Sequence, residues 1–210
     1  MKAPFLIGLT GGIGSGKSTV ASQLQSLGAE VVSGDELGRQ ALETTPALLA
    51  EIRVRFGDDV FDQDGTLRRR MLGDKVFANP EHAHWLTHRT FPIIHRLWRE
   101  AVARSAADVV VLDAALIFEW DIAEEFDLLL IVLADRNLVA HRMQAGGRLS
   151  APEIEARLAL QIPPQDKARR ADVVLVNDGS LDEFLEKVRE FWTKRVLPEL
   201  EQRRERVNGS

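Results

Sequence analysis

The chain has 210 residues, of which 45% are hydrophobic and 28% charged, a balance typical of a folded globular domain. The absence of cysteine excludes disulfide frameworks, thiolate metal sites and cysteine catalysis. The formal net charge of -5 argues against a general nucleic-acid binder. No apolar run reaches the length of a membrane span and no signal peptide is evident, so we expect a cytoplasmic monomer with neither nucleic acid nor membrane as a partner.

Apolar runs and helical patterns alternate along the chain, which is typical of a parallel sheet covered by helices. In chain order, the runs predict strands at 5–10, 30–33, 109–113, 127–134 and 172–176. The patterns between them predict helices at 17–27, 35–43, 46–56, 67–77, 80–105, 136–145, 150–161 and 180–206. Pro92 should kink or divide the longest helix. We therefore expect an α/β fold in a single domain over residues 1–210.

Two segments stand out from this alternation. Residues 36–107 contain helices but no convincing strand, so they are expected to form a helical insertion that binds an acceptor. Residues 136–170 hold seven Lys or Arg against three acidic residues, although the chain as a whole is acidic. This basic segment suits a compact polyanion such as a nucleotide, and a solvated helical surface is the alternative interpretation.

A glycine-rich loop follows the first predicted strand and matches the complete G-x-x-x-x-G-K-[ST] pattern. Its glycines let the backbone wrap closely around phosphate oxygens, and the helix that begins near Lys17 adds a positive dipole end. Lys17 should reach the β- and γ-phosphates of a nucleotide, and Ser18 should offer its hydroxyl to Mg²⁺. The residues expected to bind ATP are Gly11, Gly12, Ile13, Gly14, Ser15, Gly16, Lys17, Ser18 and Thr19.

Four further side chains are candidate partners of this loop. Asp113 closes an apolar strand, where a carboxylate holds magnesium in many nucleotide-binding proteins or serves as a turn residue. Asp35 begins a helix, where it is either an N-cap or a carboxylate that orients an acceptor hydroxyl. Arg142, in the basic segment, is expected to close over the transferred phosphoryl group unless it is a solvated surface residue. Asn177 opens a turn after the last strand, where it is a candidate contact for the nucleotide base.

The order of motifs along residues 6–188 resembles the dephospho-CoA kinase family. The resemblance rests on LTGGIGSGKST at 9–19, VVSGDELGRQ at 31–40, VVVLDAALIFE at 109–119, HRMQAGGRLSAPEIEARLALQ at 141–161 and KARRADVVLVN at 167–177. It implies a three-layer P-loop kinase fold with a five-stranded parallel sheet, a helical CoA-binding insertion at 36–107 and a mobile helical lid at 136–170. It also implies that ATP phosphorylates the ribose 3′-hydroxyl of dephospho-CoA, the last step of coenzyme A biosynthesis.

Carried over by position, the resemblance assigns ATP binding to residues 11–19, a place near the acceptor ribose to Asp35, and the first lid arginine to Arg142. The sequence departs from the family pattern at four positions. Ser33 stands where the family often has an aspartate, Phe91 where it has a histidine before proline, and Ala115 where it has a proline. Gly146 stands at the second lid arginine, with Arg148 two residues further on.

Two other functions stay open, the first of them because of these departures. A kinase of another small molecule, such as a nucleoside monophosphate or a shikimate-like alcohol, would share the loop and differ in its acceptor. A nucleotide-dependent switch ATPase would need no small acceptor, although the chain lacks the Asn-Lys-x-Asp motif that reads a guanine base.

Overall fold

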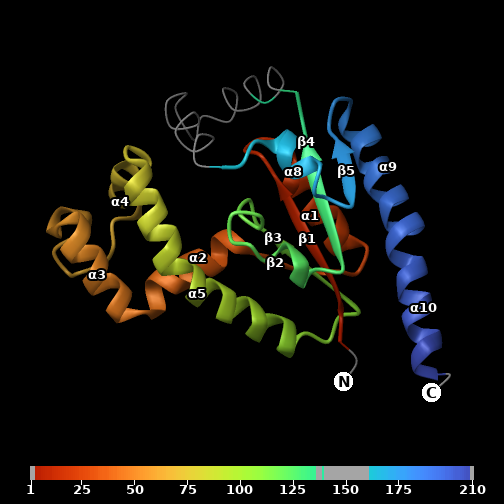
Figure 1. Cartoon of the computed structure of the whole chain (residues 1–210), viewed down its shortest axis with the longest axis horizontal. Coiled ribbons are helices and arrows are strands. Elements are labelled where there is room, and N and C mark those ends of the chain that lie inside the picture. Colours follow the sequence, from red (N-terminus) through yellow and green to blue (C-terminus); the bar gives the residue numbers. More distant parts are fainter. Residues whose placement is uncertain (1–2, 136–138, 140–160, 209–210) are drawn as a thin grey trace.

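The computed structural model describes residues 3–135, Val139 and 161–208, which form a sheet with helices on both faces (Figure 1). Five parallel strands are hydrogen-bonded in the order β2-β3-β1-β4-β5. Their bounds are β1 Phe5–Gly11, β2 Glu30–Ser33, β3 Val109–Asp113, β4 Leu128–Leu133 and β5 Val173–Val176. The prediction of an α/β fold with these five strands is confirmed. Because all strands are parallel, their carboxyl ends meet at one edge, which we call the carboxyl edge of the sheet.

The helices account for most of the remaining described chain. Their bounds are α1 Lys17–Ser26, α2 Gly34–Thr44, α3 Pro46–Phe56, α4 Arg69–Phe77, α5 Pro80–Arg104, α8 Pro164–Ala168, α9 Leu181–Phe191 and α10 Leu197–Asn208, with short 3₁₀ turns at Asp58–Val60 and Ala123–Glu125. The helices predicted at 136–145 and 150–161 lie outside the described residues. Within the described part, no helix combines the length and apolar composition that a membrane crossing requires.

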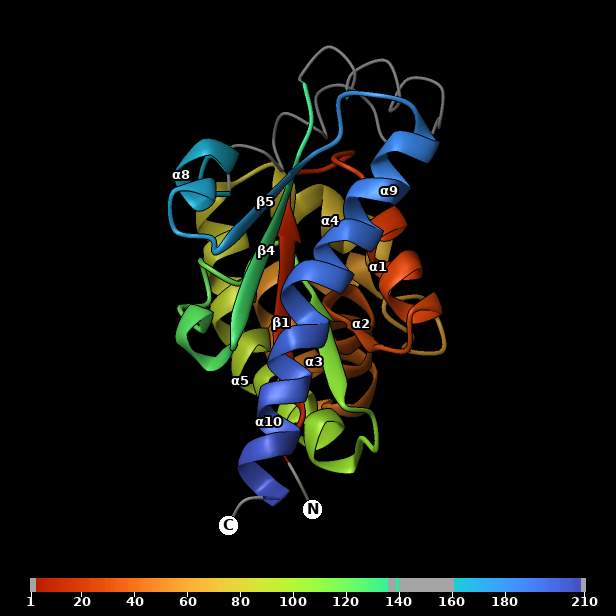
Figure 2. The same ribbon diagram turned by 90° about the vertical axis from the view of Figure 1, so that its right-hand side faces the viewer.

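The three central strands, β3, β1 and β4, are buried on both faces, as is typical of a parallel sheet covered by helices. Alternate residues of β3 point to opposite sides, so Val109 and Val111 join one apolar cluster while Val110 and Leu112 join the other. The first cluster contains side chains of α1, α9 and α10, and Figure 2 shows α9 and α10 lying across that face. The second contains side chains of α2 and α5. Layers on both faces explain why these strands are apolar runs rather than alternating ones.

The segment between β2 and β3 forms a helical insertion with its own apolar core. Buried residues of α3 and α4, including Ile52 and Phe56, pack together with Val60 and Phe61. Helices α3 and α4 lie apart from the sheet (Figure 1). The insertion joins the rest of the molecule through α5, where Phe91 stacks on Trp120 with ring centroids 5.7 Å apart.

In two helices the structure goes beyond the sequence prediction, which left open whether Pro92 kinks or divides the longest one. Helix α5 runs through Pro92 as one helix from Pro80 to Arg104, so the proline does not divide it. Buried residues on both sides of the proline, such as Thr90 and Ile94, pack the helix in place, and this packing outweighs the lost hydrogen bond. The short helix α8 was not predicted, because Pro163 and Pro164 indicate a loop and five residues show little periodicity.

The last predicted helix, 180–206, is confirmed as one continuous helical segment from Leu181 to Asn208. It begins with a capping box, in which Ser180 and Glu183 satisfy each other's backbone amides. A π-helical turn at Trp192–Val196 separates α9 from α10, and its Trp192 and Val196 are buried against the sheet. The wider turn adjusts the helix so that both halves bury an apolar face.

Candidate functional site

The glycine-rich loop turns between β1 and α1 at the carboxyl edge of the sheet. Gly14 and Gly16 have positive φ angles of 70° and 104°, which side chains rarely tolerate. Helix α1 begins at Lys17 without a side-chain cap and without an acidic residue in its first turn. The loop therefore has the backbone conformation and the helix start that a phosphate-binding site needs.

Asn177 braces this loop from the far end of the chain. Its side-chain Nδ2 donates to the carbonyl of Ser15 over 2.9 Å, and the residue is buried. A β-carbon on Gly16 would lie 2.4 Å from that same Nδ2, so only glycine fits between α1 and Asn177. The structure thus gives Asn177 a supporting contact with the loop, whereas the sequence had suggested a contact with the base.

The candidate charged residues converge beside the loop. Lys17 Nζ lies 4.0 Å from Asp113 Oδ1, and both side chains are about four-fifths buried, with exposed fractions of 20% and 21%. Burial raises the pKa of Asp113, the nearby Lys17 opposes this shift, and the negative charge of Asp35 adds to it. Two carboxylates and one ammonium therefore share this corner of the site. Their net charge is negative, so a bound cation would be stabilised there.

Asp35 is held near Asp113 by the packing of its neighbour. A β-carbon on Gly34 would lie 2.7 Å from Ala114 Cβ, so the start of α2 sits directly against the end of β3. The N-cap of α2 is Ser33, whose hydroxyl accepts from the amide of Glu36. The interpretation of Asp35 as an N-cap is therefore wrong, and its exposed carboxylate is left to the site. Ser33, one of the departures from the family pattern, serves as the helix cap, a role that aspartate would also fill.

The residues present fit a magnesium ion that is held mainly by phosphate and water. Magnesium prefers hard oxygen ligands and keeps several waters. Ser18, in the first turn of α1, and Asp113, at the end of β3, offer such oxygens next to the loop. No group of three or more histidine, cysteine, aspartate or glutamate side chains is arranged to hold a metal within residues 3–135 and 161–208. The surplus carboxylate charge near Asp113 is what a divalent cation would offset.

The structure does not bear on the remaining candidates. Arg142, Gly146 and Arg148 lie outside the described residues, as does most of the predicted lid at 136–170.

One buried ion pair at the same edge was missed by the sequence analysis. Lys167 is 2% exposed in its side chain, and its Nζ lies 2.6 Å from Glu119 Oε1. Both residues fall in segments that carry the family resemblance, but neither was distinguished from its neighbours. Only the tertiary structure shows that the lysine of α8 is buried and paired across 48 residues of chain.

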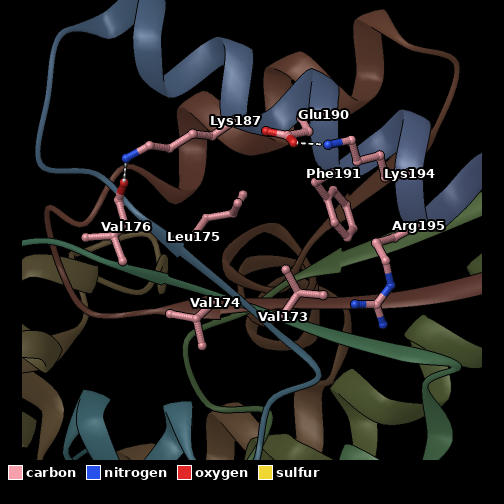
Figure 3. A pocket seen from close by; sticks show the side chains of 9 residues that line it. All are labelled: Val173, Val174, Leu175, Val176, Lys187, Glu190, Phe191, Lys194 and Arg195. Atoms are coloured by element: carbon pink, nitrogen blue, oxygen red, sulfur yellow. Dashed lines mark hydrogen bonds and ion pairs between the residues drawn. The ribbon is translucent and has the colours of Figure 1, made fainter.

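Two surface hollows lie away from this site. One, of about 390 Å³, lies between β5 and α9, where Lys187 donates to the carbonyl of Val176 and the valines of the edge strand are partly exposed (Figure 3). The other, of about 840 Å³, lies between α3 and α5 around Trp85. Neither is lined by the loop, Asp35 or Asp113.

Known proteins are similar to this chain over most of its length. The family model described as dephospho-CoA kinase matches residues 5–183. A dephospho-CoA kinase of Geobacter sulfurreducens is 38% identical over 193 residues, covering 90% of this chain and 98% of that protein. One from Geobacter metallireducens is 40% identical over 196 residues, covering 91% and 97%.

Solved structures agree in fold. A crystal structure from Thermus thermophilus has a TM-score of 0.79 and 37% identity, covering 95% of this chain and 99% of that one. Dephospho-CoA kinase from Campylobacter jejuni has a TM-score of 0.65 and 24% identity, covering 90% and 96%. With the family model spanning the loop, the insertion and the described carboxylates, this chain belongs to the dephospho-CoA kinase family.

Proposed function

We propose that the protein transfers the γ-phosphoryl group of ATP to the ribose 3′-hydroxyl of dephospho-CoA, giving coenzyme A and ADP. The observation that carries the proposal is the family match over residues 5–183, which spans both the loop and the helical insertion. Membership of the family makes the protein a phosphotransferase that uses ATP. The cytoplasmic location and the monomeric state stay predictions.

In this reaction the loop residues 11–19 bind the phosphates of ATP. Their amides and Lys17 stabilise the negative charge that spreads over the transferred group, which is the main contribution of an enzyme to phosphoryl transfer. The positive φ angles of Gly14 and Gly16 and the uncapped start of α1 support this role. Lys17 is restrained next to Asp113, so its ammonium is held in place before substrate arrives.

Ser18 and Asp113 would hold the magnesium ion that accompanies ATP. When bound, the ion supplies positive charge that neutralises the phosphate oxygens during transfer. The largely buried Asp113 carboxylate meets little competing water, and the nearby charge of Lys17 favours its ionised form against the effect of burial. The raised pKa of Asp113 means that a loss of positive charge near it, or a fall in pH, weakens the site.

Asp35 orients the acceptor. The 3′-hydroxyl oxygen attacks the γ-phosphorus, the bond from that phosphorus to the bridging oxygen of ADP breaks, and the hydroxyl proton passes toward the Asp35 carboxylate. An exposed carboxylate at the start of α2 suits this task because it lies within electrostatic reach of Asp113 and is not used as a cap. The helical insertion at 36–107 binds the rest of the acceptor, and Arg142 with the lid at 136–170 closes over the phosphates and excludes water.

The test is release of ADP from MgATP with dephospho-CoA, run beside AMP, CMP, shikimate and no acceptor. We expect turnover above the acceptor-free rate only with dephospho-CoA, and a product whose mass has increased by one phosphate. Turnover with another acceptor would make the protein a different small-molecule kinase. Equal rates with and without every acceptor would favour a nucleotide-dependent switch.

A further inference from the structure

Lys167 occupies an unusual place for a lysine. Its side chain is 2% exposed, and burial lowers its pKa while the Glu119 carboxylate opposes that shift. A lysine is almost never fully buried unless it is paired. The nearby positive charge of Lys17 lowers the pKa of Lys167 further, so the two ammonium groups lie in the same electrostatic neighbourhood.

The ammonium of Lys167 links α8 to a segment that lies about 50 residues earlier in the sequence. Its Nζ donates to the carbonyl of Ala115 over 2.7 Å in addition to pairing with Glu119. The same carbonyl accepts from Thr10 Oγ1, whose residue is fully buried and directly precedes the loop. Ala115 itself lies two residues after Asp113. One carbonyl is therefore shared by the end of β1 and by α8, and it fixes the chain that follows the Asp113 carboxylate.

Two further observations place the chain around α8, one next to the segment after β3 and one next to the loop. Glu119 Oε1 also accepts from the amide of Ile162 over 2.8 Å, which holds the chain just before α8. A β-carbon on Gly12 would lie 3.6 Å from Pro164 Cγ, which is ordinary van der Waals contact. These contacts and the shared carbonyl make α8 a brace between the glycine-rich loop and the end of β3.

We propose that Lys167 is a positioning residue, which holds Asp113 in register with the phosphate loop by donating to the Ala115 carbonyl. The Glu119 carboxylate has a different task, which is to make the buried ammonium tolerable. This inference rests on the proposed function only in that Asp113 serves a magnesium nucleotide. Lys167 has two roles that no single substitution can distinguish: it completes a buried ion pair, and it helps to place the Asp113 carboxylate.

The two roles respond differently to substitution. Lys167→Met leaves the Glu119 carboxylate buried without its charge partner, so it should lower the melting temperature. Adding Glu119→Gln removes that orphan charge, so the double variant should recover most of the melting temperature. In both variants the Ala115 carbonyl has lost the Lys167 donor, so both should keep the positioning defect.

The decisive measurement is the affinity for ATP by calorimetry at increasing Mg²⁺, with no acceptor and below the melting temperature of every variant. We expect the half-saturating Mg²⁺ concentration to rise about tenfold or more in Lys167→Met and in the double variant, because losing a group that orients a metal-binding side chain typically costs this much in metal affinity. Glu119→Gln alone, which keeps the Lys167 donor to Ala115, should show a smaller rise than Lys167→Met. ATP affinity without Mg²⁺ should change little.

Lys75→Met is the matched control. Lys75 Nζ also donates to a backbone carbonyl, that of Phe56 at 2.6 Å, and to a carboxylate, that of Asp59 at 2.7 Å, but it lies in the helical insertion. We expect no change in the Mg²⁺ dependence of ATP binding for this variant.

Recovery of both melting temperature and Mg²⁺ dependence in the double variant would overturn the proposal and leave Lys167 a structural residue. An unchanged Mg²⁺ dependence in Lys167→Met would do the same. If Lys167→Met does not fold, the neutral double variant still decides between the two roles. Because no acceptor is present, a failure of dephospho-CoA as substrate would overturn the proposed function without affecting this result.

Discussion

Four charged side chains at the carboxyl edge of the sheet are largely buried, whereas the ion pairs of the helical insertion lie on its surface. At the edge, the side chains of Lys17, Asp113, Glu119 and Lys167 have exposed fractions of 20%, 21%, 14% and 2%. In the insertion, the ion pair of Arg69 with Glu43 is exposed by 43% and 51%, and that of Lys75 with Asp59 by 36% and 56%. Exposed pairs contribute little to stability, while buried charges are costly unless they are paired or used. The buried charges therefore lower the stability of the edge while supplying the groups that the reaction needs. The insertion is instead held together by its apolar core.

Removing the ammonium nearest the loop should show the largest effect of this difference. Lys17→Ala should lower kcat by about a hundred- to a thousandfold, as the loss of one preorganised donor does. The melting temperature should fall modestly, because the substitution leaves the largely buried Asp113 carboxylate without the positive charge that offsets its burial. Steady-state kinetics and thermal unfolding check this. Full activity in Lys17→Ala would contradict the proposed mechanism.

The insertion should show the reverse pattern. Ile52 is fully buried in its core, so Ile52→Ala should destabilise the protein by about 2–5 kcal/mol. ATP affinity should be retained below the melting temperature, while KM for dephospho-CoA should rise if the insertion binds the acceptor as proposed. Val54→Ala on the same helix is the control, since Val54 is 89% exposed and should change neither quantity. A large loss of ATP affinity in Ile52→Ala would mean that the two regions are coupled.

Two glycines with nearly the same positive φ angle allow backbone strain to be separated from side-chain contact. Gly16 and Gly28 have φ angles of 104° and 105°, so alanine at either should cost on the order of 1–2 kcal/mol in backbone strain. Only at Gly16 does the added β-carbon meet another atom closely, Asn177 Nδ2 at 2.4 Å, whereas Gly28 has nothing within 4 Å. We expect Gly16→Ala alone to weaken ATP binding, measured by calorimetry. Equal ATP affinities for the two variants would show that the close packing on Asn177 does not shape the loop.

The folded protein should gain stability when the charge of Asp113 is removed, and this gain should depend on pH. Burial raises its pKa in the folded protein, so the protonated form is favoured by folding and the associated stability is lost as pH rises through that raised pKa. Asp113→Asn should therefore raise the melting temperature near neutral pH by about 2–4 °C per kcal/mol regained, and less at a pH below the ordinary aspartate pKa.

Activity should move in the opposite direction to stability in this variant. The amide cannot hold magnesium as the carboxylate does, so kcat should fall and the Mg²⁺ requirement should rise. Thermal unfolding at several pH values and Mg²⁺ titration of activity measure the two effects. A variant that loses both stability and activity at neutral pH would contradict the assignment of Asp113 as a buried charge retained for function.

The sequence alone determined the α/β class, the five strands and the glycine-rich loop. These features depend on neighbours in the chain: apolar runs that suit a strand buried on both faces, and glycines that tolerate positive φ angles. Resemblance to a family added the acceptor, and the family comparison supports it. The two proposed uses of Asp35 could not be separated at that level, because a cap and a catalytic carboxylate occupy the same position at the start of a helix.

Only the tertiary structure decided the strand order, the capping role of Ser33 and the pairing of Lys167 with Glu119. Strands that are uniformly apolar carry no signal for their neighbours, so β3 could not be placed between β2 and β1 from its residues. A lysine in a basic segment resembles a solvated one until its surroundings are known. Burial, and with it the difference between a surface charge and a positioned one, depends on contacts across the fold, which the order of residues does not specify.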